Sequence, residues 1–306
     1  MHLTTPVIPS IPHFRLLPET PVLLLGSCFS DEMAVRMQQS GLPVAANPFG
    51  TLYNPASIAT LLSRALDDVP ISEEQMVFHD GLWHSWLHHT SFSSPDRDTC
   101  LSLCNEAIHR TFDLIHGAQP PVLILTFGTA YVFSLTTESP QTLALPGTPS
   151  IVANCHKLPA SYFTRRRLSV AEICKIWQPL LVRLMEKGIR IIFTVSPIRH
   201  LADGAHDNQL SKSTLMLAID QLIGMEPERF CYFPSYEILM DELRDYRFYD
   251  RDLCHPSDLA VDILWERFSQ TFFTPAHQQQ LILNRKHYRQ TLHRPISSQP
   301  QHPLST

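Results

Sequence analysis

The sequence has little charge, no basic block and no long hydrophobic run. Asp, Glu, Lys and Arg make up 17 % of the 306 residues, and the formal net charge is −5. Nucleic-acid-binding chains carry a basic patch that is missing here, so we expect no nucleic-acid partner. Apolar runs such as Val22–Leu25 and Val122–Leu125 are far too short to cross a bilayer, so we expect no membrane-spanning segment and no membrane partner.

The cysteines lack any paired arrangement. They are odd in number and none belongs to a CxxC motif, which argues against both a disulfide framework and a zinc site. The N-terminal stretch Met1–Pro12 has neither the basic start nor the apolar core of a secretory signal. These features predict a cytoplasmic protein. The seven cysteines are Cys28, Cys100, Cys104, Cys155, Cys174, Cys231 and Cys254.

The sequence does contain enough apolar residues, 44 %, for a substantial core. Since three-layer α/β sheets reach this length as one unit, we expect a single domain over residues 1–306 with its core at about 20–273. The proline-rich residues 1–20 are expected to form an extended lead-in. The polar residues 275–306 are expected to form a peripheral helix and a frayed tail.

A repeated alternation of strands and helices predicts the fold. The mostly apolar runs Val22–Gly26, Pro121–Gly128 and Ile189–Pro197 are typical of strands buried on both faces of a parallel sheet, and Arg229–Pro234 is a weaker fourth. This alternation predicts a three-layer α/β/α sandwich around a mostly parallel sheet, with ligands bound beyond the carboxyl ends of the strands. Helices are expected directly after the first strand and over Val170–Lys187, Ser211–Ile223 and Leu259–Phe268.

One segment, at about residues 74–92, departs from this alternation. Asp80-Gly81 between apolar and aromatic flanks predicts a β-hairpin insertion, whose Trp83 and Trp86 would cover the cleft or contact another chain. On a strand, His84 and His88 would lie roughly 13 Å apart, too far to bind one ion, so we expect no metal site. No cofactor is expected either. Strand alternation would divide the residues between two faces, with His84, Trp86 and His88 on one and Trp83, Leu87 and His89 on the other.

Ser27 and Cys28 stand at the turn between the first strand and the first helix. Backbone N–H groups at a helix start carry partial positive charge, which lowers the pKa of a thiol and can stabilise an oxyanion. Either residue is therefore a candidate nucleophile. The structural alternatives are that Ser27 or Ser30 caps the helix and that Cys28 packs as a small apolar residue. A low-pKa thiol would also suit a redox sensor.

The second candidate motif is Asp252-Leu-Cys-His255-Pro256, before the last predicted core helix. An Asp three residues before a His can meet the imidazole within one local turn. There the carboxylate sets the tautomer of the ring and stabilises the imidazolium. Such a His is a candidate general base.

Together the two motifs resemble the SGNH/GDSL hydrolases and, more narrowly, the GSCFA family assigned to that superfamily. The resemblance covers about residues 20–260. It implies a three-layer, flavodoxin-like α/β/α fold and an esterase-type hydrolase or acyltransferase. The residues that carry it are Gly26–Ser30, Asn47–Thr51, Asn54-Pro55, Phe127–Ala130, Asn154–Lys157, Ser196–His200 and Asp252–His255.

The resemblance also implies roles for individual residues. Ser27 takes the place of the superfamily's Asp and Cys28 that of its nucleophilic Ser, which implies a Cys28–His255–Asp252 triad. Ser27 is the nucleophile if the turn is rotated by one residue. The superfamily's oxyanion-hole Asn follows a Gly, whereas here Thr129 follows Gly128. The missing amide would then come from Asn47 or Asn154, with the N–H groups of Cys28 and Gly50 as further donors.

Three further residues are candidates for substrate binding. Arg199 and His200 follow a strand end and therefore lie on the rim of the sheet, where an Arg can bind a carboxylate or phosphate. A surface salt bridge is the alternative for Arg199. His156 lies in an irregular stretch that either lines the pocket or forms a solvated loop.

Three hypotheses for function follow. The first is an enzyme that transfers an acyl or acetyl group from a small-molecule or carbohydrate ester. The second is a catalytically silent fold that binds a carbohydrate or acyl ligand or serves in assembly, and the third is a redox-sensing thiol at Cys28. Only the enzyme needs His255 for turnover.

Overall fold

The computed structural model describes residues 5–140, 143 and 148–292, and its centre is one parallel sheet. The strand order is β2-β1-β5-β8-β9, which is the flavodoxin-like order. The predicted parallel sheet is confirmed, and β2 is a strand that the sequence did not reveal. The five strands are β1 (Val22–Gly26), β2 (Val44–Ala46), β5 (Val122–Phe127), β8 (Arg190–Val195) and β9 (Phe230–Tyr232).

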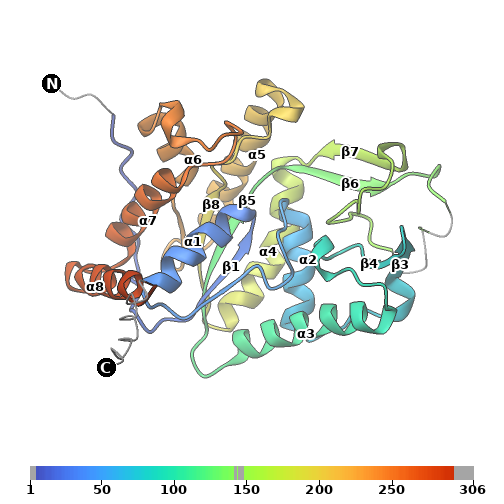
Figure 1. Ribbon diagram of the computed structural model, residues 1–306, viewed down its shortest axis with the longest axis horizontal. Coiled ribbons are helices and arrows are strands. Elements are labelled where there is room, and N and C mark those ends of the chain that lie inside the picture. The colour runs from blue at the N-terminus through green and yellow to red at the C-terminus, as the bar shows by residue number, and fades with distance from the viewer. Residues whose placement is uncertain (1–4, 141–142, 144–147, 293–306) are drawn as a thin grey trace, which may run out of the picture.

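Helices connect the strands and cover both faces of the sheet (Figure 1). The short α6 continues into one π-helical turn, Ile238–Glu242. The α-helices of the described residues are α1 (Cys28–Gln39), α2 (Pro55–Leu66), α3 (Arg97–His116), α4 (Val170–Glu186), α5 (Ala205–Ile223), α6 (Ser235–Glu237), α7 (Asp258–Phe272) and α8 (Pro275–Leu292).

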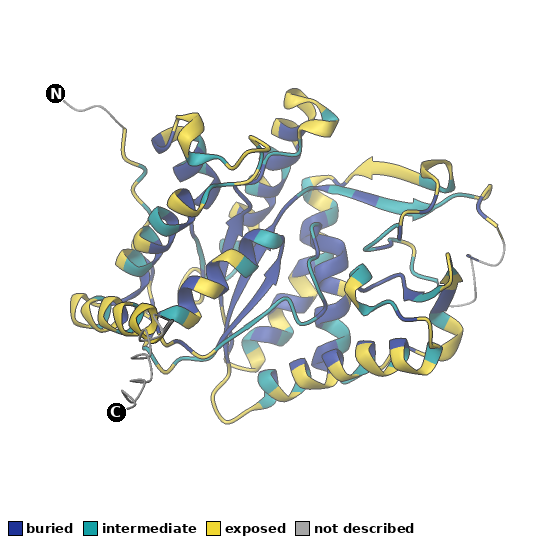
Figure 2. Ribbon diagram, in the orientation of Figure 1, coloured by how far each residue is buried: buried dark blue, intermediate teal, exposed yellow. Residues whose placement is uncertain are grey.

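Each face of the sheet has its own core because alternate strand residues point to opposite sides. Leu23 and Leu25 join a cluster with α2, α3, α4 and α5. Val22 and Leu24 join a second cluster with α1 and α7. Figure 2 shows the strands buried at the centre and the exposed residues on the outer sides of the helices. The three-layer sandwich is therefore confirmed.

The start of α5 differs from the sequence prediction. The helix begins at Ala205 and not at Ser211. Its first turns bury the polar residues Asn208, Ser211 and Lys212, so the apolar periodicity appears only from Leu215 onward. These buried polar groups lie against the ends of β5 and β8, at the candidate site.

Two small antiparallel sheets lie at one end of the molecule (Figure 1). β3 (Met76–His79) and β4 (Leu82–Ser85) form the predicted hairpin around Asp80-Gly81, while β6 (Tyr131–Leu135) and β7 (Phe163–Arg167) form a second pair. A small core that includes Trp86 and Val152 joins the two.

The predicted strand alternation beyond Ser85 was wrong. β4 ends at Ser85 and the chain turns there, with the N–H of His88 donating to the Ser85 carbonyl at 3.3 Å. Trp86, Leu87 and His88 are all buried. Within the described part of the chain, no helix has the length and apolar character needed to span a membrane.

Candidate active site

The candidate site lies where the connections of the sheet change direction. From β1 the chain continues to β2 on one side, and from β5 it continues to β8 on the other. The crevice beyond the carboxyl ends of two such strands is the usual ligand site of an open α/β sheet. Ser27 and Cys28 follow β1, and Gly128 and Thr129 follow β5.

Gly26 shapes the turn that carries Cys28. Its φ is +148°, and a Cβ at this position would lie 2.1 Å from the Thr126 carbonyl oxygen. Only glycine therefore allows β1 to end so close to β5. Asn47 holds the same turn: its Oδ1 accepts from the Gly26 N–H at 2.9 Å, and its Nδ2 donates to Asp31 Oδ1 at 2.9 Å.

The side chains of Ser27 and Cys28 lie in different surroundings. Ser27 is fully buried and its Oγ donates to Ser196 Oγ at 3.0 Å. Ser27 stands at the N-cap position of α1 without a side-chain capping bond, so the predicted hydroxyl cap is absent. Cys28 is half-buried and lines an open cleft.

The surroundings of Cys28 raise the pKa of its thiol overall. Burial raises the pKa of the thiol, and the carboxylates of Asp31 and Glu32 raise it further. The N–H groups of Cys28 and Phe29, in the first turn of α1, act in the opposite direction because they donate toward the sulfur. A thiolate at this position therefore needs an additional positive charge.

Asp252 and His255 form a pair on the loop before α7. Asp252 Oδ2 lies 2.5 Å from His255 Nδ1, while Oδ1 accepts the N–H groups of Cys254 and His255 at 2.9 Å each. These backbone bonds, followed by the His255 side chain, hold the pKa of Asp252 at about 2. Leu253, with φ of +57°, gives the loop the tight bend that the pair needs.

Cys28 and His255 line the same cleft, which has a volume of about 520 Å³. Among the described residues no hydrogen bond joins the thiol to the imidazole. The His255 side chain is 49 % exposed, so its ring is accessible to a ligand in the cleft. The other lining residues are Phe29, Glu32, Ile198, Asp250, Pro256, Ser257 and Asp258.

Arg36 connects the helix that carries Cys28 to the loop that carries His255. Its side chain is 8 % exposed, and its guanidinium lies 2.6 Å from Glu32 Oε2 and 2.6 Å from Asp258 Oδ1. A third contact, at 3.1 Å, reaches Asp262 Oδ1. The start of α7 is thereby fixed against α1.

Three backbone N–H groups at the candidate site already have partners. The N–H groups of Gly128 and Thr129 both donate to the Tyr53 carbonyl, at 2.8 and 2.9 Å. The N–H of Gly50 donates to the Asn47 carbonyl at 2.7 Å. The N–H groups of Cys28 and Phe29, in contrast, have no acceptor within the helix because they belong to its first turn.

Asn154 and His156 lie with the hairpin and are not among the residues that line the cleft. Asn154 Oδ1 accepts the N–H of His156 at 2.8 Å, and His156 Nε2 lies 2.9 Å from the Ser85 carbonyl oxygen. The His156 ring packs beside His84, with centroids 4.3 Å apart. Burial lowers the pKa of His156 to about 4, which favours a neutral ring.

Arg199 and His200 lie beside the loop of His255. The N–H of Arg199 donates to the Cys254 carbonyl at 3.3 Å, and no ion pair joins its guanidinium to a carboxylate in the described residues. The His200 ring meets Tyr53 edge-on at 6.2 Å. Burial, and after it the charge of Lys212, lowers the pKa of His200 to about 4.

Lys212 belongs to this region although sequence reasoning missed it. Its Nζ donates to the carbonyls of Gly128 and Ser196, at 2.7 and 2.8 Å. A lysine near a polar helix start looks solvated in the sequence. The signal that could have found it is the helical spacing from Leu215 and Ile219, which places Lys212 on the buried face of α5.

Among the described residues, no group of three or more His, Cys, Asp or Glu is arranged to hold a metal ion. The histidines of the hairpin serve local structure. His84 contacts Ser93 Oγ at 2.6 Å and the His79 carbonyl at 3.1 Å, and His88 contacts Ser85 Oγ at 3.0 Å.

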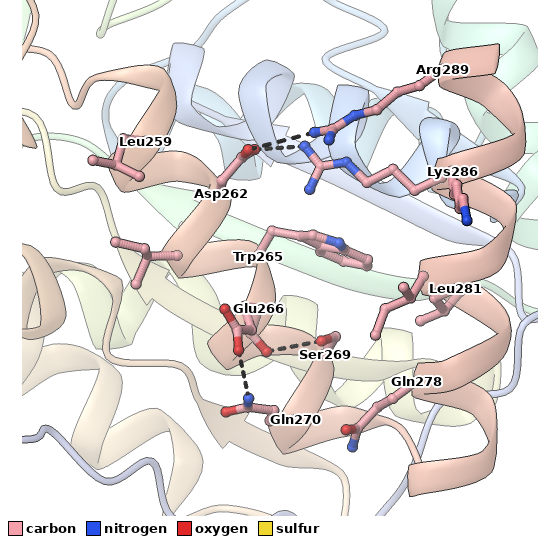
Figure 3. A pocket seen from close by; sticks show the side chains of 13 residues that line it. Leu259, Asp262, Trp265, Glu266, Ser269, Gln270, Gln278, Leu281, Lys286 and Arg289 are labelled. Atoms are coloured by element: carbon pink, nitrogen blue, oxygen red, sulfur yellow. Dashed lines mark hydrogen bonds and ion pairs between the residues drawn. The ribbon is translucent and has the colours of Figure 1, made fainter. Parts of the chain in front are cut away.

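A larger hollow, of about 620 Å³, lies between α7 and α8 (Figure 3). Trp265 and Leu281 form its apolar floor, and Asp262 pairs with Arg285 and Arg289 at its rim. Its lining includes neither cysteine nor histidine. The candidate nucleophile Cys28 and the candidate base His255 therefore share the smaller cleft.

Comparison with known proteins identifies the family of this chain. No match was found among curated proteins. The family model described as the GSCFA family matches residues 21–268, which include β1, the Cys28 turn, the Asp252–His255 loop and most of α7. The chain belongs to the GSCFA family.

Proposed function

We propose that this protein is an ester hydrolase or acyltransferase in which Cys28 is the nucleophile, His255 the general base and Asp252 the residue that orients His255. One observation carries the proposal: Cys28 and His255 line the same cleft while Asp252 binds His255 Nδ1. That bond leaves Nε2 of the ring to exchange protons. Ser27 is buried against Ser196, which favours Cys28 as the nucleophile.

The reaction would proceed through a thioester. The Cys28 thiolate attacks the ester carbonyl, and the tetrahedral intermediate expels the alcohol, which takes its proton from the His255 imidazolium. A water molecule, or an acceptor alcohol, then loses a proton to His255 and attacks the thioester. The acid or the new ester leaves, and the thiolate is restored. Ionised Asp252 stabilises the imidazolium in both halves.

The N–H groups of Cys28 and Phe29 are the donors best placed to hold the oxyanion. They open α1, where the helix dipole favours negative charge, and they already donate toward the Cys28 sulfur. Arg199 could bind an anionic part of the substrate, since no carboxylate in the described residues pairs with it.

We extend the proposal to the superfamily, the substrate class and the cellular location of the protein. The sheet order and the positions of the Cys28 and His255 motifs support membership of the SGNH/GDSL superfamily. We propose an acylated or acetylated small molecule or carbohydrate as the substrate. All seven cysteines are free thiols, which supports a reducing, cytoplasmic setting.

A silent binding fold is the second candidate, and a specific observation favours it. The N–H groups of Gly50, Gly128 and Thr129 are occupied by backbone carbonyls, which leaves the first turn of α1 with fewer neighbours to help it hold an oxyanion. One missing donor typically costs about 2.7–4 kcal/mol of transition-state stabilisation.

The test is turnover of p-nitrophenyl esters of short and long acyl chains. We expect Cys28→Ala and His255→Ala to abolish it and Ser27→Ala to retain most of it. Asp252→Asn should lower kcat by on the order of 10²–10⁴-fold, because the amide cannot stabilise the imidazolium. Circular dichroism checks the fold of each variant.

Two outcomes would contradict the proposal. If Ser27→Ala abolishes turnover while Cys28→Ala retains it, the nucleophile is Ser27. If the wild type turns over no ester of the panel, or if His255→Ala matches the wild type, the binding fold takes precedence.

A further inference from the structure

A lysine is fully buried behind the turn that carries Cys28. Lys212 has no exposed side-chain area, and its Nζ donates to the carbonyls of Gly128 and Ser196. These residues follow the neighbouring strands β5 and β8. The ammonium therefore ties together the carboxyl ends of two strands at the floor of the candidate site.

Lys212 has no acidic partner among the residues that the structure describes. Within the described residues no carboxylate forms an ion pair with it, and its other close neighbour is the ring of Tyr236, whose centroid lies 5.6 Å from Nζ. A buried ammonium without an anion is costly, and burial lowers the pKa of Lys212 to about 7. The negative charge of a Cys28 thiolate acts in the opposite direction and raises this pKa.

Ser27 and Ser196 connect the lysine to the cysteine. Lys212 Nζ binds the Ser196 carbonyl, and Ser196 Oγ accepts from the Oγ of Ser27, the residue directly before Cys28. The four residues therefore form one continuous chain of contacts. Lys212 therefore lies on the buried side of the Cys28 turn, away from solvent.

We propose that Lys212 is a positioning residue that supplies the positive charge for the Cys28 thiolate, and that the two groups ionise as a pair. The inference rests on the proposed function, because it concerns the nucleophile of that reaction. When the thiol loses one proton and the amine gains one, the pair stays neutral overall. The buried site accepts such a pair more readily than a lone charge of either sign.

The other titratable groups nearby do not replace Lys212. Asp31 and Glu32 on α1 oppose the thiolate. His200 would oppose the ammonium if charged, but its pKa of about 4 leaves it neutral at neutral pH. His255 faces the thiol from the open side of the cleft, so it can carry protons to and from solvent while Lys212 stays in place.

The first experiment measures alkylation of Cys28 by iodoacetamide between pH 6 and 10, followed by mass spectrometry of the peptide that contains it. Lys212→Met removes the charge and keeps most of the volume. We expect its profile to move to higher pH by about one unit, which slows alkylation at pH 7.5 about tenfold. Lys175→Met, on the exposed side of α4, is the matched control and should follow the wild type. A folded Lys212→Met variant with the wild-type profile would overturn the pairing.

The second experiment keeps the lysine and changes the cysteine. Because coupling between two sites is reciprocal, Cys28→Ser should lower the pKa of Lys212 by about the amount that Lys212→Met raises that of Cys28. NMR of ¹³C-labelled lysine side chains measures this directly. An unchanged Lys212 titration would overturn the proposal even if Lys212→Met fails to fold.

Neither measurement depends on ester turnover. If the coupled titrations are present and no ester is hydrolysed, the hydrolase proposal fails and the ion pair remains. If the protein hydrolyses esters through Cys28 and His255 but both titrations are unchanged, the hydrolase proposal is supported and the proposed role of Lys212 is contradicted.

Discussion

At the scale of single residues, each of three consecutive positions has its own structural role in the Cys28 turn. Gly26 lets the strand end beside Thr126, Ser27 turns inward to Ser196, and Cys28 opens α1 at the cleft. Exchange of any two of these residues would put a side chain where the backbone of β5 lies, or would remove the thiol from the cleft. The proposed chemistry therefore depends on which of these adjacent residues occupies which position.

Gly26→Ala tests this dependence. Its Cβ would lie 2.1 Å from the Thr126 carbonyl oxygen, so β1 and β5 must separate at their carboxyl ends. We expect a loss of about 3 kcal/mol or more in the free energy of unfolding, measured by urea denaturation. Gly81→Ala is the matched control: its φ is also positive, at +74°, but no atom lies within 4 Å of the added Cβ.

Gly81→Ala should cost only about 1 kcal/mol, from backbone strain alone. Equal losses at the two positions would show that the contact with β5 does not constrain the turn. Alkylation of Cys28 in the Gly26→Ala variant, where it folds, should change as well, since the first turn of α1 moves with the strand end.

At the scale of elements, the site depends on the docking of α7 on α1. Arg36 is the buried centre of that contact, with Glu32 on its own helix and Asp258 and Asp262 on α7. Asp258 also lines the cleft. The ion pairs therefore fix the distance between the helix that presents Cys28 and the loop that presents His255.

Arg36→Met should lower the free energy of unfolding by about 1–3 kcal/mol, as measured by urea denaturation. Removal of one partner of a fully buried ion pair costs more, about 3–5 kcal/mol. The cost is smaller here because Glu32 and Asp258 are 49 % and 93 % exposed and can bind water in place of Arg36. Arg110→Met is the control, because Arg110 forms an exposed pair with Glu106 on α3 that should contribute less than about 1 kcal/mol.

Ester turnover should fall more in Arg36→Met than in Arg110→Met, because only the first substitution loosens α7. Equal stability of the two variants would mean that apolar contacts alone hold α7 on α1. Those contacts include Met33, Val261 and Leu264.

The elements that the sequence predicted are those with a strong local signal. β1, β5 and β8 are short apolar runs, and Asp80-Gly81 marks the β3–β4 turn. β2 has only three residues, which is too short for a pattern. β7, with the sequence FTRRR, has four exposed residues in five and was missed because its side chains meet solvent instead of a core.

The residues of the candidate site were likewise predicted only where a local motif marks them. Cys28 and the Asp252–His255 pair were found because each belongs to a compact motif. The rotation of one turn determines whether Ser27 or Cys28 faces the cleft. Tertiary contacts with Asn47 and Ser196 set that rotation, and the sequence does not reveal them. Lys212 comes from a helix far along the chain, and no local pattern joins it to Cys28.

At the scale of the whole molecule, the buried histidines and the buried lysine gather in two places. His84, His88 and His156 lie beside the small core between the hairpins, whereas His200 and Lys212 lie behind the cleft. Both regions are beyond the carboxyl ends of the strands. The stability of the protein should therefore respond to pH through this end.

Acid should destabilise the protein between pH 6.5 and 5. Burial lowers the pKa of His88 to about 3 and those of His156 and His200 to about 4, below the value of about 6.5 in the unfolded chain. In this window the unfolded state binds more protons than the folded state, so stability is complete above pH 6.5 and is lost as the pH falls. Each histidine contributes about 1.3 kcal/mol between pH 7 and 5.5, or about 4 kcal/mol together.

His109 acts in the opposite direction, because Asp68 raises its pKa, but it is exposed and its effect should be small. Urea denaturation at pH 7 and pH 5.5 measures the difference. His88→Phe should reduce this difference by about 1 kcal/mol, since a ring of similar size replaces the one that must stay neutral. His206→Phe, at an exposed site on α5, should leave it unchanged. If His88→Phe keeps the full difference, the buried histidines are not its source, and the loss of stability must come from the carboxylates.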